Sequence, residues 1–555
     1  MLAKIFPIFN WLPSYQKEWF RYDVVAGLTA AAVVIPKAMA YAAIAGLPLV
    51  IGLYTSLVPL VVYAIMGTSR PLSVTSTSTI AILSAGAIGV VAPAGDTATL
   101  MSVSATLALL TGVFLLLGGL FRLGVVANLI SDPVLTGFKA GIGLVIVLDQ
   151  LPKLLGIHIT KAGFLRDIGS IGAHLPETSI PTLLLALAML GLMLGLEHFA
   201  PKVPAPLITV AIGIAASSFA GLDKFGIALV GKVEAGLPSF AIPDFALIGQ
   251  LWPAALGIAL MSFVETAAAG RAFMKRGDLP LDANRELLAT GVANLAGSLF
   301  HIMPSGGGTS QTAVNNNAGA RSQVSGLVTA GVVVATLLFM APLFGLMPHP
   351  TLAAVVVIAS IGLISPAEFR SILKIRSMEF RWALIAVAGV LFLGTLKGIL
   401  VAVLVSLVAL MIRANRYPLL VLGRKPGTNV FRPRSDEHPE DETFPGLLLL
   451  RPEGAIYFAN APRIGQRIRA LRQELTPRVV VLDFSAVPDL EFSALRMLTE
   501  GEERAREEGV LLWLVALNPE VLKVVQNSPL WERLGRERMF FTLEQAVEKY
   551  QKDCG

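Results

Sequence analysis

Long apolar blocks separated by short polar breaks run from Asp23 to about Arg413. A membrane-spanning helix needs about 20 apolar residues, or fewer where the helix is broken inside the protein. On that rule the chain is predicted to contain an all-α polytopic membrane domain. Its fourteen expected spans lie at residues 24–46, 48–67, 76–92, 100–121, 124–147, 180–198, 204–220, 251–275, 286–301, 309–319, 323–345, 351–365, 380–396 and 398–413.

The pattern changes after the last apolar block, because charges of both signs become dense from Tyr417 onward. Apolar runs predict buried strands at 446–450, 479–483 and 511–517, and charged helical segments are expected at 461–474, 493–508 and 539–550. Strands that alternate with helices indicate a small α/β domain. The expected parts are an N-terminal cytoplasmic segment at 1–23, a membrane domain at 24–416, a linker at 417–443 and a soluble domain at 444–555.

Composition agrees with this division. The chain is 54% hydrophobic and only 15% charged, whereas globular domains average about 25% charged residues. Its single cysteine, Cys554, excludes a disulfide framework and any multi-cysteine metal site. We expect no metal, no cofactor and no enzymatic activity, and we identify no pattern of a cleaved signal peptide in residues 1–22. The formal net charge of +6 comes from basic residues beside the spans, which favours membrane topology over nucleic-acid binding.

The distribution of basic residues predicts the orientation of the chain, because loops on the cytoplasmic side are enriched in lysine and arginine. Four short loops on the other side, at 47–48, 92–100, 301–309 and 345–351, carry neither residue. Both termini are therefore expected in the cytoplasm, with the protein in the cell's inner membrane. The basic residues of the expected inner loops are Arg70, Arg122, Lys202, Arg271, Lys275, Arg276, Arg285, Arg321, Arg370, Lys374 and Arg376, followed by Arg413 and Arg416 after the last span.

Two short segments at matching places indicate internal symmetry. The third and tenth spans both begin in an unusual polar run, at 73–79 and 304–312. Each is third in a half of seven spans, and an odd number reverses the orientation of the second half. This is the inverted-repeat arrangement of secondary transporters, in which short interrupted helices point to a site at the membrane midplane. The repeats are expected at about 24–220 and 251–413.

The two polar runs are candidates for an anion-binding site. Helix N-termini expose unpaired N–H groups and the positive end of the helix dipole, so two such ends can bind an anion. A glycine run that ends at Gly308 would let the backbone approach a ligand. Ordinary helix caps are the simpler alternative, but the symmetric placement favours a site. Its expected donors are Ser76, Thr77, Ser78, Thr309 and Ser310.

Two ionisable residues lie well inside predicted spans, Lys37 in the first and Glu265 in the eighth. Burying such a residue costs about 2.5–3.5 kcal/mol on insertion scales, so both are functional candidates. A buried salt bridge that only holds the halves together is the structural alternative. Because a carboxylate repels an anionic cargo unless it is neutralised, we expect Glu265 to be a protonatable coupling residue. Tyr41, one helical turn after Lys37, could face the same cavity or could be packing.

Several motifs in order resemble the sulfate permease (SulP) family of anion transporters. They are the run from Lys37 to Tyr41, Gly52-Leu-Tyr54, Pro59, Tyr63, residues 67–71, Glu265 in its apolar context, residues 313–315 and residues 318–321. The tail resembles the STAS domain, which sulfate transporters share with anti-sigma-factor antagonists. The resemblance implies a fourteen-span fold of two inverted seven-span repeats, divided into core and gate subdomains and usually dimeric. It also implies a cargo among sulfate, bicarbonate, chloride, oxalate and dicarboxylates.

The chain departs from the family pattern at positions that affect chemistry. Many members have arginine where this chain has Gln311, and often glutamine where it has Lys37, so the positive charge is inferred to have moved from span ten to span one. Sodium-coupled bicarbonate members resemble a pattern of aspartate at position 265 with a hydroxyl one turn later. Here that later residue is Ala269. A sodium site with fewer oxygens is less plausible, which favours proton coupling.

In the tail, Phe492 replaces the serine that antagonist proteins phosphorylate, and Ser493 stands beside it. Phosphorylation control is accordingly not expected, and Ser493 is predicted as a possible helix cap.

The leading hypothesis is a proton-coupled symporter of sulfate or a C4-dicarboxylate such as fumarate, which works by alternating access. An uncoupled exchanger or channel for bicarbonate or chloride remains open. A uracil or xanthine permease shares a similar fold, but the purine-permease signature is missing. A membrane-anchored regulator without transport is the fourth alternative. The expected partners are the anion, a proton, the lipid bilayer, a second copy of the chain and cytoplasmic proteins bound through the tail.

Overall fold

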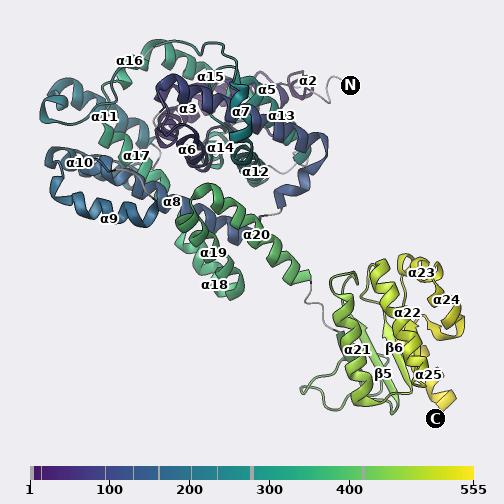
Figure 1. Ribbon diagram of the computed structural model, residues 1–555. Helices are drawn as coiled ribbons and strands as arrows, with labels where there is room; N and C mark the ends of the chain where they lie inside the picture. Colours follow the sequence, from purple (N-terminus) through teal and green to yellow (C-terminus); the bar gives the residue numbers. More distant parts are fainter. Residues whose placement is uncertain are drawn as a thin grey trace. The chain divides into compact units, whose positions relative to one another are not determined.

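A computed structural model describes residues 6–13, 15–93, 95–128, 130–159, 163–201, 203–233, 235–274, 281–414 and 419–554. The chain divides into two compact units, Met1–Leu407 and Val408–Gly555. Figure 1 shows helices alone in the first unit apart from two very short strands, and a sheet with helices in the second. Four basic loop residues of the topology argument lie outside the described residues, namely Lys202, Lys275, Arg276 and Arg416.

The membrane unit consists of two successive sets of helices. The first set contains α2 (Ile8–Trp11), α3 (Trp19–Ile44), α4 (Leu49–Thr55), α5 (Val58–Met66), α6 (Ser78–Val91), α7 (Thr97–Leu120), α8 (Asp132–Leu155), α9 (Phe164–His174), α10 (Ile180–Phe199) and α11 (Ala205–Ala220). The second contains α12 (Ile248–Ala272), α13 (Ala283–Ser298), α14 (Thr309–Asn317), α15 (Val324–Ala335), α16 (Ala341–Phe344), α17 (His349–Ile361), α18 (Pro366–Ile375), α19 (Ser377–Leu393) and α20 (Thr395–Ala414).

These helices form a multi-pass membrane domain, as the apolar blocks predicted. Within the described ranges, nine helical segments are long and apolar enough to cross a membrane by themselves. The half-helix α6 and helix α11 are shorter apolar helices. Helix α14 is also short, with nine residues. The prediction of fourteen spans therefore stays a prediction.

Two local features differ from the expected elements. The span predicted at 124–147 is instead α8, because residues 123–128 form a 3₁₀ turn and Pro133 stands at the start of the helix. Left-handed Gly156 then ends α8. Helices α9 and α18 were not predicted at all. Each is short and carries charged residues among its apolar ones, so neither has the continuous apolar run on which the span prediction depends.

The packing of the helices has the symmetry expected of an inverted repeat. Helix α3 packs against α14 and α15, and its counterpart α12 packs against α6 and α7. Likewise α8 contacts α19, and α17 contacts α10. In both halves, therefore, the first helix lies against the short third helix of the other half. This exchange brings the two halves together around α6 and α14.

The second unit is an α/β domain with a six-stranded sheet in the order β4-β3-β5-β6-β7-β8. Strands β5 to β8 are parallel, whereas β3 and β4 are antiparallel additions at one edge. The strands are β3 (Leu419–Arg424), β4 (Phe431–Pro433), β5 (Leu447–Pro452), β6 (Val479–Asp483), β7 (Leu511–Val515) and β8 (Met539–Phe540). The helices are α21 (Ala461–Leu475), α22 (Phe492–Glu507), α23 (Pro519–Gln526), α24 (Pro529–Leu534) and α25 (Leu543–Cys554).

The segment 417–443 was expected to be a linker, but its described part supplies β3 and β4 to the sheet. Leu419–Val421 pairs with Leu450–Pro452 of β5, so this stretch belongs to the domain. The prediction failed because antiparallel pairing at an edge needs only a short apolar run, and 419–422 was counted with the polar residues that follow it.

The tail has hydrophobic cores of its own on both faces of the sheet. Alternate residues of β5 point to opposite sides: Leu448 and Leu450 join a cluster under α21 to α24, while Leu447 and Leu449 join a cluster under α25. All members of both clusters lie between residues 419 and 550. Because a domain with its own core can in principle fold alone, the tail is expected to fold when it is separated from the membrane domain.

Candidate anion-binding site

The two half-helices meet at a two-residue antiparallel ladder. Strand β1 (Val74–Thr75) precedes α6 and strand β2 (Gly306–Gly307) precedes α14, and Val74 pairs with Gly307. The ladder continues where the Gly308 amide donates to the Ser73 carbonyl at 3.0 Å. Figure 1 shows α6 and α14 near each other in the membrane unit. Both helices therefore begin at this ladder, and we call the ladder with the starts of α6 and α14 the crossing.

Capping residues start each half-helix. Thr77 is extended, and its side-chain oxygen accepts a hydrogen bond from the Ile80 amide at 3.3 Å, so that Ser78 becomes the first residue of α6. Gly308 is the extended N-cap of α14 and offers no side chain, so Thr309 opens that helix without a side-chain cap. Thr309 and Ser310 are exposed, whereas Ser76, Thr77 and Ser78 are buried.

The glycines let the crossing lie directly against α12. A Cβ on Gly306 would stand 2.8 Å from the Ser262 hydroxyl, and one on Gly307 would stand 2.7 Å from the Thr266 backbone. Those two α12 residues also hold the ladder: Ser262 donates to the Ser305 carbonyl at 2.7 Å, and Thr266 accepts from the Gly307 amide at 2.7 Å. The ladder is therefore fixed to α12 by close backbone contact and by hydrogen bonds.

Glu265 lies on α12 between those two anchors. Its carboxylate accepts a hydrogen bond from the Thr77 hydroxyl at 2.7 Å, and its side chain is buried. The Thr77 hydroxyl therefore caps α6 and also donates a hydrogen bond to the Glu265 carboxylate. In the part of the chain that the structure describes, no three His, Cys, Asp or Glu side chains converge on a possible metal.

Lys37 lies on α3 and faces the other half-helix. Its ammonium donates to the Ser310 hydroxyl at 2.6 Å. The lysine is half-buried and its partner is exposed, so this side of the crossing is the more accessible one. Both residues are described, and Lys37 and Glu265 form no ion pair with each other.

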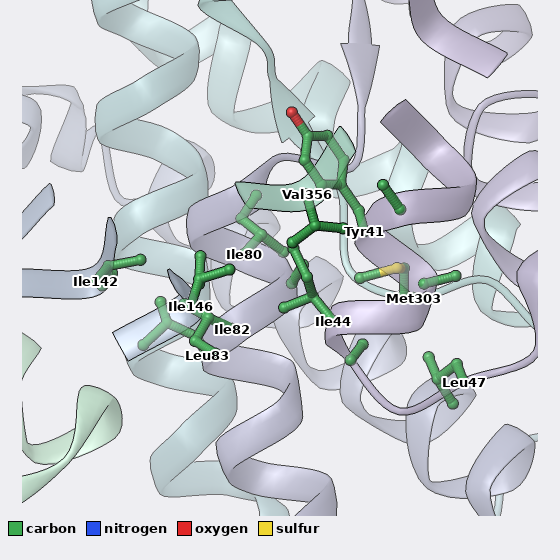
Figure 2. Close-up of a cluster of buried hydrophobic side chains, with 14 of the residues drawn as sticks. Tyr41, Ile44, Leu47, Ile80, Ile82, Leu83, Ile142, Ile146, Met303 and Val356 are labelled. Carbon is green, nitrogen blue, oxygen red and sulfur yellow. The ribbon is translucent and has the colours of Figure 1, made fainter. Parts of the chain in front are cut away.

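Gln311 and Tyr41 lie near the crossing but do not contact Lys37 or Glu265 by a hydrogen bond in the described structure. The Gln311 amide is buried, donates to the Ser76 carbonyl at 3.4 Å, and folds back toward Gly308. The ring of Tyr41 belongs to the large apolar cluster of the membrane unit, while its hydroxyl points away from the neighbouring apolar side chains (Figure 2). Tyr41 therefore combines packing with a polar end near the start of α6.

A cluster of buried apolar side chains lies beside the crossing. Ile80 and Leu83 of α6 pack among Ile44 and Met303, and Figure 2 shows Ile142 and Ile146 of α8 on the neighbouring side. The apolar environment strengthens any charge interaction at the crossing, because screening by water is weak there.

Sequence reasoning missed several supporting residues. The Asn294 side chain accepts from the Ser305 amide at 2.8 Å and donates to its carbonyl at 3.1 Å. Elsewhere in the membrane domain, the buried Asp23 carboxylate accepts hydrogen bonds from the Arg321 amide at 2.7 Å and from the Ser322 hydroxyl at 2.6 Å. A polar residue within an apolar run was the available signal for Asn294.

Inverted helical repeats that meet at two half-helices define a polytopic membrane protein of the secondary-transporter class. Residues 20–386 match the sulfate permease family, and residues 438–546 match the STAS domain. The chain belongs to the sulfate permease family: it is an anion transporter, not an enzyme, and it ends in a STAS domain. This confirms the family and the fold class that the motifs predicted.

Named relatives extend over nearly the whole chain. A Mycobacterium tuberculosis (strain CDC 1551 / Oshkosh) protein named probable sulfate transporter MT1781 is 34% identical over 543 residues, which cover 97% of this chain and 96% of the relative. An Arabidopsis thaliana protein named probable sulfate transporter 4.2 is 32% identical over 568 residues, covering 98% and 83%.

Solved structures share the fold. The inward-facing murine Slc26a9 anion transporter superposes with a TM-score of 0.92 at 23% identity, covering 99% of this chain and 94% of that one. The transmembrane domain of the cyanobacterial bicarbonate transporter BicA gives a TM-score of 0.62 at 22% identity, covering 71% and 98%. At these identities the likeness shows the fold alone.

Proposed function

We propose that this protein is a proton-coupled symporter of sulfate or of a C4-dicarboxylate such as fumarate, and that it works by alternating access. The observation that carries the proposal is the separation of two opposite charges at the crossing. Lys37 contacts the exposed Ser310, whereas Glu265 contacts the buried Thr77. The printed names of the relatives, which describe sulfate transporters, support sulfate within this class.

The charges at the crossing match a divalent anion. Two helix N-termini contribute roughly +0.5 charge each, and the Lys37 ammonium adds a full charge, so the sum is about +2 when Glu265 is protonated. Thr309 and Ser310 add exposed hydroxyl donors on the same side. We therefore assign anion binding to Lys37, Tyr41, Ser76, Thr77, Ser78, Gly308, Thr309, Ser310 and Gln311, with Lys37 and Ser310 in direct contact with the cargo.

Glu265 would couple the proton to the anion. An ionised carboxylate beside the crossing repels an approaching anion, and a protonated one does not. Proton binding at Glu265 therefore favours anion binding at the other side of the ladder. The separate hydrogen bonds of Lys37 and Glu265 support coupling through the electric field rather than through a lysine–glutamate pair that must break.

An uncoupled exchanger or channel for bicarbonate or chloride is the second candidate. The Thr77 contact favours this candidate, because Glu265 could serve only to orient the hydroxyl that caps α6. Glu265 would then have a structural role and would not carry a proton. In that case the rate of anion exchange would be insensitive to a pH gradient.

Transport by purified protein in proteoliposomes tests both candidates. With the membrane potential clamped at zero, an inward proton gradient should drive radiolabelled sulfate above its external concentration. Unlabelled fumarate, bicarbonate and chloride then rank the cargo by competition. Sulfate exchange that is equal with and without the gradient would replace the symporter by the exchanger. Absence of both sulfate uptake and fumarate uptake would reject the cargo classes proposed.

We also propose that the protein lies in the cell's inner membrane as a homodimer with both termini in the cytoplasm. The basic loops and the soluble tail support that orientation. Labelling of single cysteines, introduced after removal of Cys554, in intact cells and in inverted vesicles would test it. The STAS domain would then be available to cytoplasmic partners.

A further inference from the structure

A second candidate binding site lies in the tail, away from the crossing. A cavity of about 410 Å³ opens between α21 and α22 above β6 and β7. Figure 1 shows these two helices side by side over the sheet. Ligand pockets typically have volumes of about 300–1,000 Å³, so this one is large enough for a small organic molecule.

Glycines create the cavity. Gly465 of α21 and Gly501 of α22 both line it, and neither supplies a side chain to fill the space between the helices. A Cβ added at Gly501 would meet no atom within 4 Å, which shows open space at that point. The floor consists of Val480, Leu482 and Leu512, so the deep end of the cavity is apolar.

The mouth of the cavity carries more positive than negative charge. Four arginines line it, Arg469, Arg472, Arg496 and Arg504, against the single acid Glu500. Glu500 is shared, since it lies 3.6 Å from the Arg496 guanidinium and 3.1 Å from that of Arg504.

Arg472 and Arg469 both line the cavity, but they differ in burial and in their partners. The side chain of Arg472 is 6% exposed, and one terminal nitrogen pairs with Glu508 outside the cavity. Its Nε is buried and has no hydrogen-bond partner. That atom is buried away from the open space of the cavity, so a bound acceptor would instead meet the exposed guanidinium of Arg469. Arg469 is described and makes no ion pair that would neutralise it.

We propose that this groove binds an amphiphilic organic carboxylate. The apolar tail would lie on Val480, Leu482 and Leu512, and the carboxylate would accept hydrogen bonds from the guanidinium of Arg469. An inorganic anion would leave the apolar floor without a partner, and a neutral apolar molecule would leave the arginine unpaired. Both parts of the ligand are therefore required.

The tail, residues 417–555, has cores of its own and can be used separately, which avoids competition from lipid. Octanoate is titrated into it by calorimetry, with 1-octanol and inorganic phosphate as matched probes that lack one of the two parts. We expect saturable binding of octanoate with at least about tenfold lower affinity for each of the other two. Equal binding of either probe, or no binding of octanoate, would overturn the proposal.

Variants locate the site. Gly501→Leu fills the groove where a Cβ meets nothing, so it should fold normally and weaken binding at least about tenfold. Arg469→Gln should weaken binding about tenfold, the size expected for a charge-assisted hydrogen bond. Arg506→Gln on the same helix, exposed and outside the groove, is the control and should bind normally. Thermal unfolding checks each fold, and octanoate binding that survives in folded Gly501→Leu would contradict the assigned site.

Discussion

Lys37 and Glu265 occupy corresponding helices of the two repeats, yet they carry opposite charges in different surroundings. Each contacts a half-helix of the other repeat: Lys37 on α3 reaches Ser310 on α14, and Glu265 on α12 accepts from Thr77 on α6. The lysine side is accessible and the glutamate side is buried. We call the Lys37–Ser310 contact and the Glu265–Thr77 contact the two arms of the site. An inverted repeat can therefore keep symmetric contacts while its two arms differ in charge and in burial.

From this difference we infer how anion binding and proton coupling would be divided between the two residues. A charge that must contact the cargo needs access, and a group that exchanges a proton only needs a path for that proton. Because both charges join one repeat to the other, a movement between the repeats would alter both contacts together. We infer that the exposed arm binds the anion and the buried arm sets when binding is favourable.

Glu265→Gln should produce the largest change, because a permanently neutral side chain cannot release and rebind the coupling proton. Concentrative uptake of sulfate driven by a pH gradient should fall to zero, whereas exchange of internal for external sulfate continues. Both rates are measured in the same proteoliposomes, so exchange controls for folding and insertion. Unchanged pH-driven accumulation in this variant would remove Glu265 from the coupling step.

Lys37→Gln should cause the next largest change, a loss of affinity for a divalent anion. A hydrogen bond to a charged group contributes about 1.5–3 kcal/mol, which corresponds to a loss of roughly 10- to 150-fold. The apparent affinity is measured from the concentration dependence of sulfate uptake. Wild-type affinity in this variant would show that the two half-helix ends suffice.

Adding Gln311→Arg to Lys37→Gln moves the positive charge from the α3 side to α14. Anion affinity should return in part if charge alone is needed. Proton coupling should return as well, because Lys37 and Glu265 make no direct contact that the exchange would break. Recovery of affinity without recovery of coupling would instead indicate a lysine–glutamate contact in another conformation.

Gly307→Ala tests whether both arms depend on the shared ladder. The added Cβ would lie 2.7 Å from the Thr266 backbone, which cannot turn aside as a flexible side chain could. We expect a loss of about 1–3 kcal/mol in stability, as for overpacked sites, and weaker sulfate binding. Gly89→Ala is the matched control, because a Cβ there meets nothing within 4 Å. Equal melting temperatures for the two variants would show that the ladder adjusts.

Much of this arrangement could be predicted from the sequence because the signals are local. Apolar length marks α3 and α12, and two polar runs mark the starts of α6 and α14. An ionisable residue inside an apolar span, such as Lys37, is conspicuous for its cost. The placement of these residues as binding and coupling groups stays a prediction until transport is measured.

Other features could not be predicted because they depend on contacts between distant residues. The pairing of Val74 with Gly307 joins segments more than 200 residues apart, and the polar runs alone do not define a register. Asn294 looks like any polar residue in a span until it is seen to bond Ser305. In the tail, Ser493 was expected as a cap, but α22 begins at Phe492 with Glu491 as N-cap.

Removing the tail should have the smallest effect on the two arms, since every residue assigned to them lies in the membrane unit. The cut must follow Ala414 at the end of α20 rather than fall near residue 444, because a cut there would leave β3 and β4 without their partner β5. Purified protein ending at Ala414 should bind sulfate with a Kd within about twofold of that of the full chain. That difference is well below the tenfold change that corresponds to about 1.4 kcal/mol. Equilibrium binding separates this from any change in transport rate or dimerisation. If the shortened protein keeps its melting temperature but no longer binds sulfate, the tail contributes to the site, and the two arms alone do not account for anion binding.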